Sequence, residues 1–369
     1  MIVTPRERVL TALDHRQPDR VPFSLGFGPT GEMQAILAAY LRERDIDWSR
    51  LAEAVLDVII VQTRYTGPME EMADLNLTPP LWGIKTKTAN YGGGAYEEFT
   101  DFPLAGVEDV AALDDYPWPD PTHFDFAGLR GDIQQANPDR HKAVRICAGN
   151  PFEIYTWMTG IEESFVNLAA EPDLVRAALS HITAFMEAKL DAILRHAGDL
   201  IDIVFLCDDL GGQTGLLMSN QTYRDVIQPF HRRLIAKARQ LAPHAQCMFH
   251  TDGAVFDIVL DLLDTGIDIL EAIQTDAAGM DPARLKAAYG TRLSFHGAIS
   301  VQHLLPHGDP AAVECECRRL VEILGKNGGY IAAPSHAIQV GTPPENVMAM
   351  LSAVLGQDAL QQALEQARV

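Results

Sequence analysis

The stretch AQCMFHTDG, residues 245–253, sets the pattern that decides the fold: a short apolar run that ends in chemically capable polar residues. Seven other runs have the same form, although two of them, near the N-terminus, are weaker. They cover residues 21–27, 57–63, 143–147, 201–206, 267–270, 292–295 and 330–334. Stretches with helical spacing separate the runs, and this alternation is typical of parallel strands joined by helices.

Eight strand-helix units predict a closed (β/α)8 TIM barrel, in which residues at the strand C-termini form the active site. Such barrels typically need about 250 residues, and the chain has 369, of which 47% are hydrophobic. We find no linker or low-complexity tract, so we expect one domain over residues 1–369. Alternating residues around the glycines at 92–94 predict a β-hairpin over residues 81–102, inserted after the second strand.

Composition narrows the range of partners. The formal net charge of −21 argues against binding to nucleic acid or to an anionic membrane surface. Residues 1–20 are charged and lack the apolar core of a signal peptide, and no apolar run approaches the roughly 18 residues of a membrane span. Five cysteines, an odd number, suit a reducing compartment. We therefore expect a cytoplasmic enzyme with a small-molecule substrate, and a homodimer is compatible with the sequence.

The strand tips supply a candidate metal site. Residues i and i+2 of a strand point the same way, so His250 and Asp252 aim an imidazole and a carboxylate at one point. His336 follows the last strand and lies at the same rim. Two histidines and one carboxylate with an open position form a common catalytic metal set. The alternative is a metal-free acid/base or hydrogen-bonding set.

Other polar residues at the rim are candidates for catalysis and for substrate contact. Asp208 and Asp209 follow a strand, and one of them is expected to be a general base or a further metal ligand; the alternative is a helix N-cap with a loop carboxylate. His296 is a candidate catalytic residue or a satisfied rim histidine. The candidate substrate contacts are Glu271, Asn150 and Gln339. His181, His196 and His231 lie on predicted helices and are expected to face solvent.

Several motifs, in order, resemble one known family. Residues 5–13 form a helix start with the preceding Thr4, in the pattern Thr4-Pro5-x-Glu7. Asp19-Arg20-Val21-Pro22 follows. Further motifs are Gly149-Asn150-Pro151-Phe152 with Trp157-Met158 and Gly160, Asp208-Asp209-Leu210-Gly211-Gly212, and His336 followed by Gly341-Thr342-Pro343-Pro344-Glu345-Asn346-Val347. Together they resemble the uroporphyrinogen decarboxylase superfamily over almost the whole chain. The resemblance implies a (β/α)8 barrel, in agreement with the strand count.

The resemblance implies one of two chemistries: cofactor-free decarboxylation of porphyrinogen acetate arms, or methyl transfer between a corrinoid and an acceptor at zinc. True decarboxylases carry an Arg-Gln-Ala-Gly-Arg run after the first strand, whereas residues 23–29 here contain no arginine. The family's catalytic Asp aligns with Thr63, and its Tyr before Met aligns with Trp157, a candidate substrate contact. These departures argue against porphyrinogen decarboxylation, because eight substrate carboxylates need cationic partners.

The methyltransferases of the family bind zinc through His-x-Cys at one strand end and a second Cys at the last strand. The corresponding positions here are His250, Asp252 and His336, so the resemblance implies a Zn²⁺ site and a corrinoid supplied by a partner protein. Nitrogen and oxygen ligands make a harder site and favour an oxygen-bearing substrate over a thiol. The alternatives are a cofactor-independent decarboxylase of a small carboxylate or porphyrinogen-type substrate, and a non-catalytic binding barrel.

Overall fold

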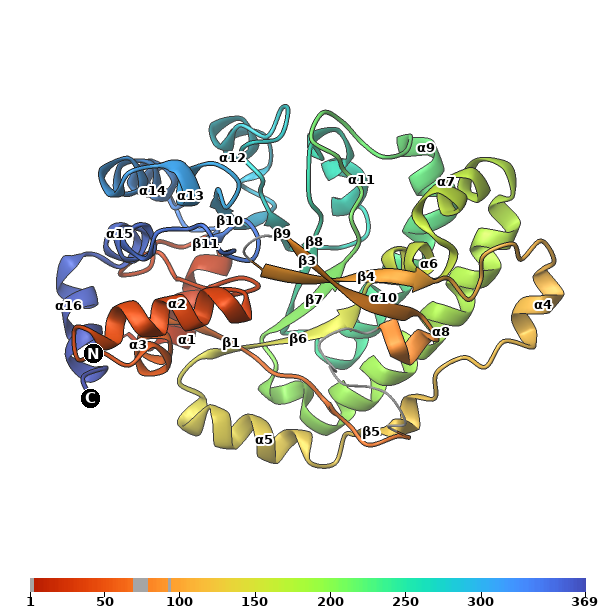
Figure 1. Cartoon of the computed structure of the whole chain (residues 1–369), viewed down its shortest axis with the longest axis horizontal. Helices are drawn as coiled ribbons and strands as arrows, with labels where there is room; N and C mark the ends of the chain where they lie inside the picture. Colours follow the sequence, from red (N-terminus) through yellow and green to blue (C-terminus); the bar gives the residue numbers. More distant parts are fainter. Residues whose placement is uncertain (1–2, 69–78, 92–93) are drawn as a thin grey trace.

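A curled parallel sheet organises the chain in the computed structural model, which describes residues 3–68, 79–91 and 94–369 (Figure 1). Its seven strands pair in chain order, apart from the small strands that lie outside it. They are β1 (Val58–Ile60), β6 (Ala143–Gly149), β7 (Ile203–Cys207), β8 (Gln246–His250), β9 (Ile269–Ala272), β10 (Ser294–Ile299) and β11 (Tyr330–Pro334).

The predicted strand at residues 21–27 is wrong as a strand, although its position is right. Phe23 forms one parallel bridge with Ala332 of β11, and the Phe23 carbonyl accepts a hydrogen bond from Asp57 N (3.0 Å), just before β1. The segment therefore lies between β11 and β1, where an eighth strand would run. A full strand does not form, because Pro22 lacks an N–H group and Gly26 turns the chain with φ of 60°.

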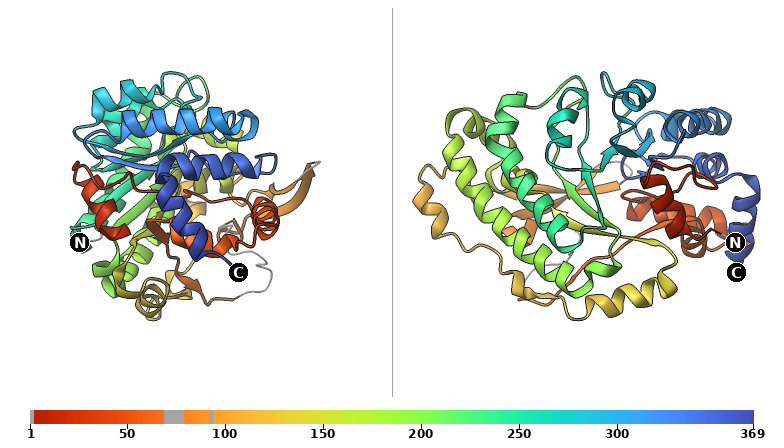
Figure 2. Two further views of the ribbon diagram at one scale, coloured as in Figure 1. Left: turned by 90° about the vertical axis from the view of Figure 1, so that its left-hand side faces the viewer. Right: turned by 180° about the vertical axis from the view of Figure 1, so that it is seen from behind.

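Helices wrap the outside of the sheet (Figures 1 and 2). They are α1 (Pro5–Leu13), α2 (Gly31–Arg42), α3 (Trp48–Val55), α4 (Val110–Asp114), α5 (Leu129–Ala136), α6 (Pro151–Thr159), α7 (Ile161–Ala170), α8 (Pro172–Ala197), α9 (Asn220–Thr222), α10 (Gln228–Leu241), α11 (Val259–Leu263), α12 (Pro282–Tyr289), α13 (Leu304–His307), α14 (Pro310–Leu324), α15 (Pro344–Leu355) and α16 (Gln357–Gln366). None of the helices in the described ranges is long and apolar enough to cross a membrane.

Two small antiparallel sheets accompany the main one: β2 (Arg64–Tyr65) with β5 (Phe124–Asp125), and β3 (Lys85–Tyr91) with β4 (Gly94–Asp101). β3 and β4 fall within the predicted hairpin at residues 81–102, and the register ends with Tyr91 opposite Gly94. Gly92 and Gly93 lie outside the described residues. That this pair is an insertion over the barrel mouth stays a prediction, as does the single domain.

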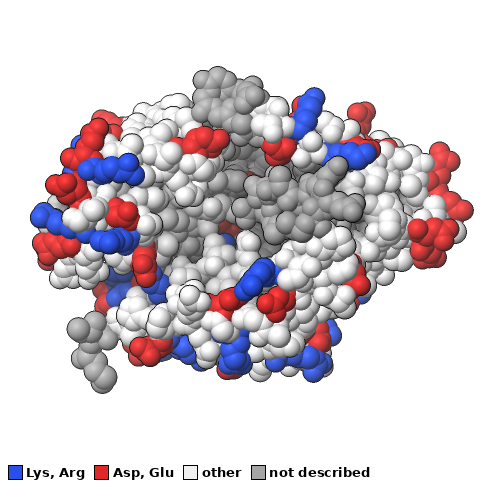
Figure 3. Space-filling model, turned by 60° about the horizontal axis from the view of Figure 1, so that its bottom comes forward, with Lys and Arg blue, Asp and Glu red and all other residues white. Residues whose placement is uncertain are grey.

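Apolar side chains fill one end of the interior of the curled sheet, and Val9 and Leu13 of α1 pack against them. This cluster is separate from the larger core between strands and helices, and burial of apolar surface drives both. The interior cluster comprises Val9 and Leu13 of α1 with Val58, Ala143, Ile203, Phe205, Met248, Ile269 and Ile331. The candidate catalytic side chains instead lie toward the other end of the strands, beyond this apolar cluster. On the face drawn in Figure 3, basic side chains lie among acidic ones.

A buried ion network joins α1 to the segment that lies beside β1. The Asp57 carboxylate accepts hydrogen bonds from Arg8 Nη1 (2.6 Å), Arg20 Nη1 (2.8 Å) and Phe23 N (2.8 Å). Asp57 is completely buried and Arg8 almost so. The carboxylate thereby fixes both the Phe23 segment and the start of β1.

We predict that Asp57→Asn lowers the free energy of unfolding by about 3 kcal/mol, because loss of one buried partner leaves the other charge uncompensated. Urea unfolding measures this difference. The control is Asp14→Asn, which breaks an exposed pair with Arg16 and should cost less than about 0.5 kcal/mol. Equal effects of the two substitutions would contradict a structural role for Asp57.

Candidate active site

Four titratable side chains form a row across adjacent strands. The parallel register places Cys207 of β7 beside His250 of β8, His250 beside Glu271 of β9, and Glu271 beside His296 of β10. Residues paired in register share a face of the sheet. The row lies at the C-terminal ends of the strands, where barrel enzymes carry their active sites.

A short hydrogen bond between His250 and Glu271 organises this row. His250 Nδ1 lies 2.6 Å from Glu271 Oε2, and Glu271 is completely buried. Burial lowers the pKa of His250, but the Glu271 carboxylate outweighs this effect and raises it to about 10. Burial would raise the pKa of Glu271, and the charges of His250 and His296 instead hold it below its usual range. Glu271 therefore fixes the proton on Nδ1 and leaves Nε2 facing the rim.

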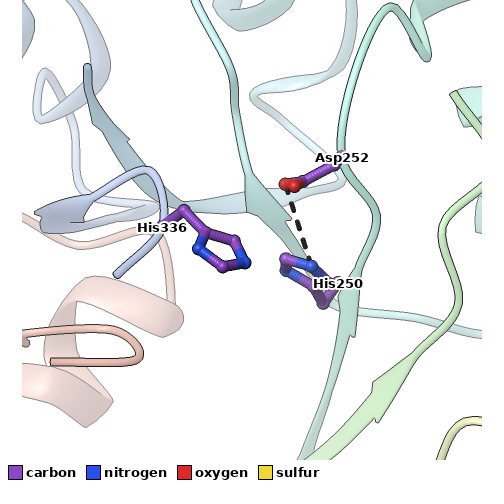
Figure 4. A group of neighbouring side chains, drawn as sticks. All are labelled: His250, Asp252 and His336. Carbon is purple, nitrogen blue, oxygen red and sulfur yellow. Dashed lines mark ion pairs between the residues drawn. The ribbon is translucent and has the colours of Figure 1, made fainter. Parts of the chain in front are cut away.

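The side chains of His250, Asp252 and His336 converge at the rim (Figure 4). His250, Asp252 and His336 each offer one ligand atom, and these atoms all lie within 4.8 Å of one another. Asp252 Oδ1 lies 3.8 Å from His250 Nε2, and it is buried without a hydrogen-bond partner among the described residues. Burial raises the pKa of Asp252 to about 6. Burial also lowers the pKa of His336, with the charge of His250 adding to the effect.

These atoms fit a cation better than they fit a closed hydrogen-bond network. A metal held by His250 Nε2 while Nδ1–H is donated to Glu271 is the usual carboxylate–histidine–metal arrangement. The buried Asp252 Oδ1, which is 3.8 Å from His250 Nε2 and accepts no hydrogen bond from the described residues, is a second possible metal ligand. Ligands bound at 2.0–2.2 Å lie closer together than 4.8 Å, so small side-chain movements are needed to close the set around Zn²⁺.

A cavity of about 500 Å³ opens beside the cluster. Asp252 and His336 line it together with Gln339, a predicted substrate contact whose role stays a prediction. Phe27 packs against both imidazoles, with ring centroids 5.0 Å from His250 and 4.8 Å from His336. The remaining lining residues are Gln274, Val301, Gln302, Pro306, His307, Val340, Gly341 and Thr342.

The two neighbouring aspartates have different surroundings. Asp209 Oδ1 lies 3.6 Å from His250 Nε2 and accepts a hydrogen bond from Asp252 N (2.9 Å). Asp208 is completely buried, and it accepts hydrogen bonds from Phe152 N (2.9 Å) and Glu153 N (2.8 Å) in the first turn of α6. Asp209 thus lies at the cluster, whereas the contacts of Asp208 match the N-cap alternative.

The expectation that His231 faces solvent is wrong. His231 is completely buried; Nε2 lies 2.6 Å from Asp208 Oδ2, and Nδ1 lies 3.1 Å from the Tyr223 hydroxyl. Its spacing from Leu234 and Ile235 puts it on the apolar face of α10, and this signal could have been read from the sequence. The chain of contacts from Tyr223 to Asp208 supports the N-terminus of α6.

Glu153 is a residue that the sequence did not single out. Its Oε2 accepts hydrogen bonds from Cys207 Sγ (3.0 Å) and from Asn150 Nδ2 (3.1 Å). Burial raises the pKa of Glu153 to about 7, and the neighbouring charges of Asp208 and Asp209 add to the effect. Asn150, predicted to read the substrate, here contacts Glu153, and its substrate role stays a prediction.

The two remaining candidates lie apart from the cavity lining. Trp157 of α6 is partly buried, and its ring centroid lies 5.5 Å from that of Phe99 in β4. His296 is buried, and its Nδ1 lies 3.5 Å from Glu271 Oε1. His296 therefore affects the cluster by its contact with Glu271. The proposed contact of Trp157 with substrate stays a prediction.

A parallel α/β barrel with titratable groups gathered at its strand C-termini has the architecture of a barrel enzyme. The family model for "Uroporphyrinogen decarboxylase (URO-D)" matches residues 87–356, well over half of the chain. The chain belongs to the uroporphyrinogen decarboxylase family, as its sequence motifs predicted.

Curated relatives within the family carry two different names. The chain is 25% identical over 196 residues to a uroporphyrinogen decarboxylase of Azoarcus sp. (strain BH72), covering 50% of this chain and 48% of that protein. It is 26% identical over 207 residues to a methylated-thiol–coenzyme M methyltransferase of Methanosarcina mazei, covering 55% and 50%. The chain thus spans about half the length of these relatives.

A solved structure shares the whole fold. A methyltransferase from Methanosarcina mazei superposes with a TM-score of 0.66 at 17% sequence identity, over 95% of this chain and 98% of that one. At this identity the likeness establishes the fold, including the curled parallel sheet predicted from the strand pattern.

We predict that Glu271→Gln lowers the pKa of His250 in metal-free protein from about 10 toward its ordinary value of 6.5. The folded pKa lies above the ordinary value, so the stabilisation from this pair is complete below pH 6.5 and is lost as pH rises through 10. NMR titration of the histidine side chains reads the shift. Glu322→Gln on the exposed face of α14 is the control, and an unchanged His250 titration in Glu271→Gln would contradict the assignment.

Proposed function

We propose that this chain is a zinc-dependent methyltransferase or demethylase that acts on a small substrate together with a corrinoid protein. One observation carries the proposal: His250 Nε2, Asp252 and His336 converge while Glu271 holds the other nitrogen of His250. The matched relative named as a methyltransferase supports methyl transfer as the reaction class. The corrinoid would arrive with the partner protein.

Each residue of the cluster has a distinct task in this proposal. His250, Asp252 and His336 would hold the ion, and Asp209, 3.6 Å from His250 Nε2, is placed to complete the set. Glu271 orients His250 and keeps its proton on Nδ1. When bound, zinc supplies a Lewis acid that stabilises negative charge on the heteroatom from which a methyl group leaves.

The ligand types favour an oxygen- or nitrogen-bearing substrate. Thiolate ligands are soft, and this chain has a carboxylate and an imidazole at the positions where the methyltransferases of the family carry cysteines. A harder site prefers harder donor atoms. We therefore propose a methyl ether or a related group as the reacting part, in contrast to the thiol in the name of the matched relative.

Charge at the rim argues against a porphyrinogen substrate. Among the described residues, the cavity lining includes one aspartate and no lysine or arginine. Glu271 and Asp209 add negative charge next to it. Eight substrate carboxylates would meet repulsion here without cationic partners. Thr63 and Trp157 further replace two residues that true decarboxylases use.

A second candidate is cofactor-independent decarboxylation of a small carboxylate. The curated relatives named uroporphyrinogen decarboxylase support it. Glu153, with a pKa of about 7, and Asp252, with a pKa of about 6, could exchange protons near neutral pH. Release of CO2 by metal-free protein would favour this candidate. A cytoplasmic location, a homodimer and the absence of nucleic-acid or membrane partners stay predictions.

We predict that His250→Ala and His336→Ala each lower zinc affinity by at least about 10- to 100-fold, and that methyl transfer falls with zinc content. Zinc is measured by mass spectrometry after dialysis against buffered zinc. The control is His307→Ala, which removes an imidazole from the same cavity but not from the cluster, and it should keep its zinc.

The metal assignment fails if both variants retain full zinc content, or if the wild type binds none under zinc-replete conditions. The acid/base account of these residues would then be the better one.

A further inference from the structure

A buried cation inside the barrel is not used by the proposed metal site. Arg145 lies in the middle of β6 and is only 5% exposed. Within the described part of the chain it forms no ion pair within 4.0 Å; its contacts are Met248 Sδ at 3.9 Å and the Phe205 ring, whose centroid lies 4.6 Å from the guanidinium carbon. A buried charge whose one hydrogen bond goes to a thioether, and which has no charged partner, is costly.

Glu271 does not form an ion pair with Arg145 within 4.0 Å, although it acts on Arg145 through its charge. Its Oε2 is already bonded to His250 at 2.6 Å. The planar fork of the guanidinium, with five N–H donors, is therefore available to a ligand.

Two positions next to Arg145 are open to solvent. Cys147 is two residues further along β6, so it faces the same way, and it is exposed to solvent. Burial of the thiol nevertheless raises its pKa. Ile60 of β1 pairs in register with Arg145 and is 47% exposed. A thiol and an apolar side chain, both open to solvent, thus flank the buried cation.

Aromatic rings connect Arg145 to the candidate metal cluster. Phe205, which lies against Arg145, has its ring centroid 6.0 Å from that of His250 and 6.2 Å from that of Phe27. Phe27 is 42% exposed and also contacts His336. A molecule lying along Phe27 would therefore have one end near the two histidines and the other directed toward β6.

We propose that Arg145 binds the carboxylate of a small substrate with an apolar, ring-containing body, and that Phe27 and Ile60 contact that body. Guanidinium and carboxylate form two parallel hydrogen bonds in a shape that few other pairs match. The inference rests on the proposed function only for the place of the reacting group, at His250, Asp252 and His336. Because the chain carries a net charge of −21, an anionic ligand needs a local positive charge, and the buried guanidinium supplies one.

Calorimetric titration with benzoate tests the proposal, with benzamide as the neutral probe. We expect wild-type protein to bind benzoate and to bind benzamide more weakly. Arg145→Met, which keeps an unbranched apolar stem and removes the guanidinium, should weaken benzoate binding about 10- to 100-fold. The control is Arg292→Met, which removes the same charge from an exposed position and should leave binding unchanged. Because Met suits an apolar interior, thermal unfolding should show a folded variant.

Alkylation of Cys147 gives a second readout. Bound benzoate should slow modification of Cys147 by iodoacetamide in the wild type but not in Arg145→Met, while exposed Cys315 on α14 reacts at the same rate throughout. Equal benzoate affinity in wild type and Arg145→Met, or no binding of benzoate by the wild type, overturns the proposal.

The two proposals fail separately in these experiments. Protein that binds zinc but not benzoate overturns the role of Arg145 alone. Protein that binds benzoate through Arg145 but takes up no zinc overturns the metal assignment alone.

Discussion

The hydrogen bond between His250 Nδ1 and Glu271 Oε2 is the constraint on which the site depends. It joins two adjacent strands at the level where the apolar interior gives way to the open rim. A completely buried carboxylate is stable there only because imidazoles flank it, His250 at 2.6 Å and His296 at 3.5 Å. The same bond leaves His250 Nε2 as a possible metal ligand beside Asp252 and His336. The orientation of the candidate ligands is therefore set by this one contact.

Charges of opposite sign lie at two places inside the barrel. Carboxylates gather around the histidines, and they favour a bound cation over a free anion. Arg145 lies beneath this rim as a separate positive group against Phe205. A substrate that carries both a polarisable heteroatom and a carboxylate would match the two places. This arrangement differs from one built for a porphyrinogen with eight carboxylates.

Sequence predicted what the strand geometry dictates and missed what depends on register. His250 and Asp252 share a face because they are two residues apart at a strand end, and the pattern of apolar runs gave the order of the strands. The tie between His250 and Glu271 requires the offset between β8 and β9, which no local pattern encodes. Arg145 was overlooked because it lies within an apolar run. The segment around Phe23 was predicted as a strand, because an apolar run that forms a single bridge looks like a strand in the sequence.

X-ray diffraction at the zinc absorption edge, on crystals grown with zinc, tests the central claim most directly. The account predicts one anomalous peak at this rim, within about 2.0–2.2 Å of His250 Nε2, an Asp252 oxygen and a His336 nitrogen, with His250 Nδ1 still bonded to Glu271. A peak bound by other residues, or no peak at this cluster in zinc-replete crystals, would contradict it.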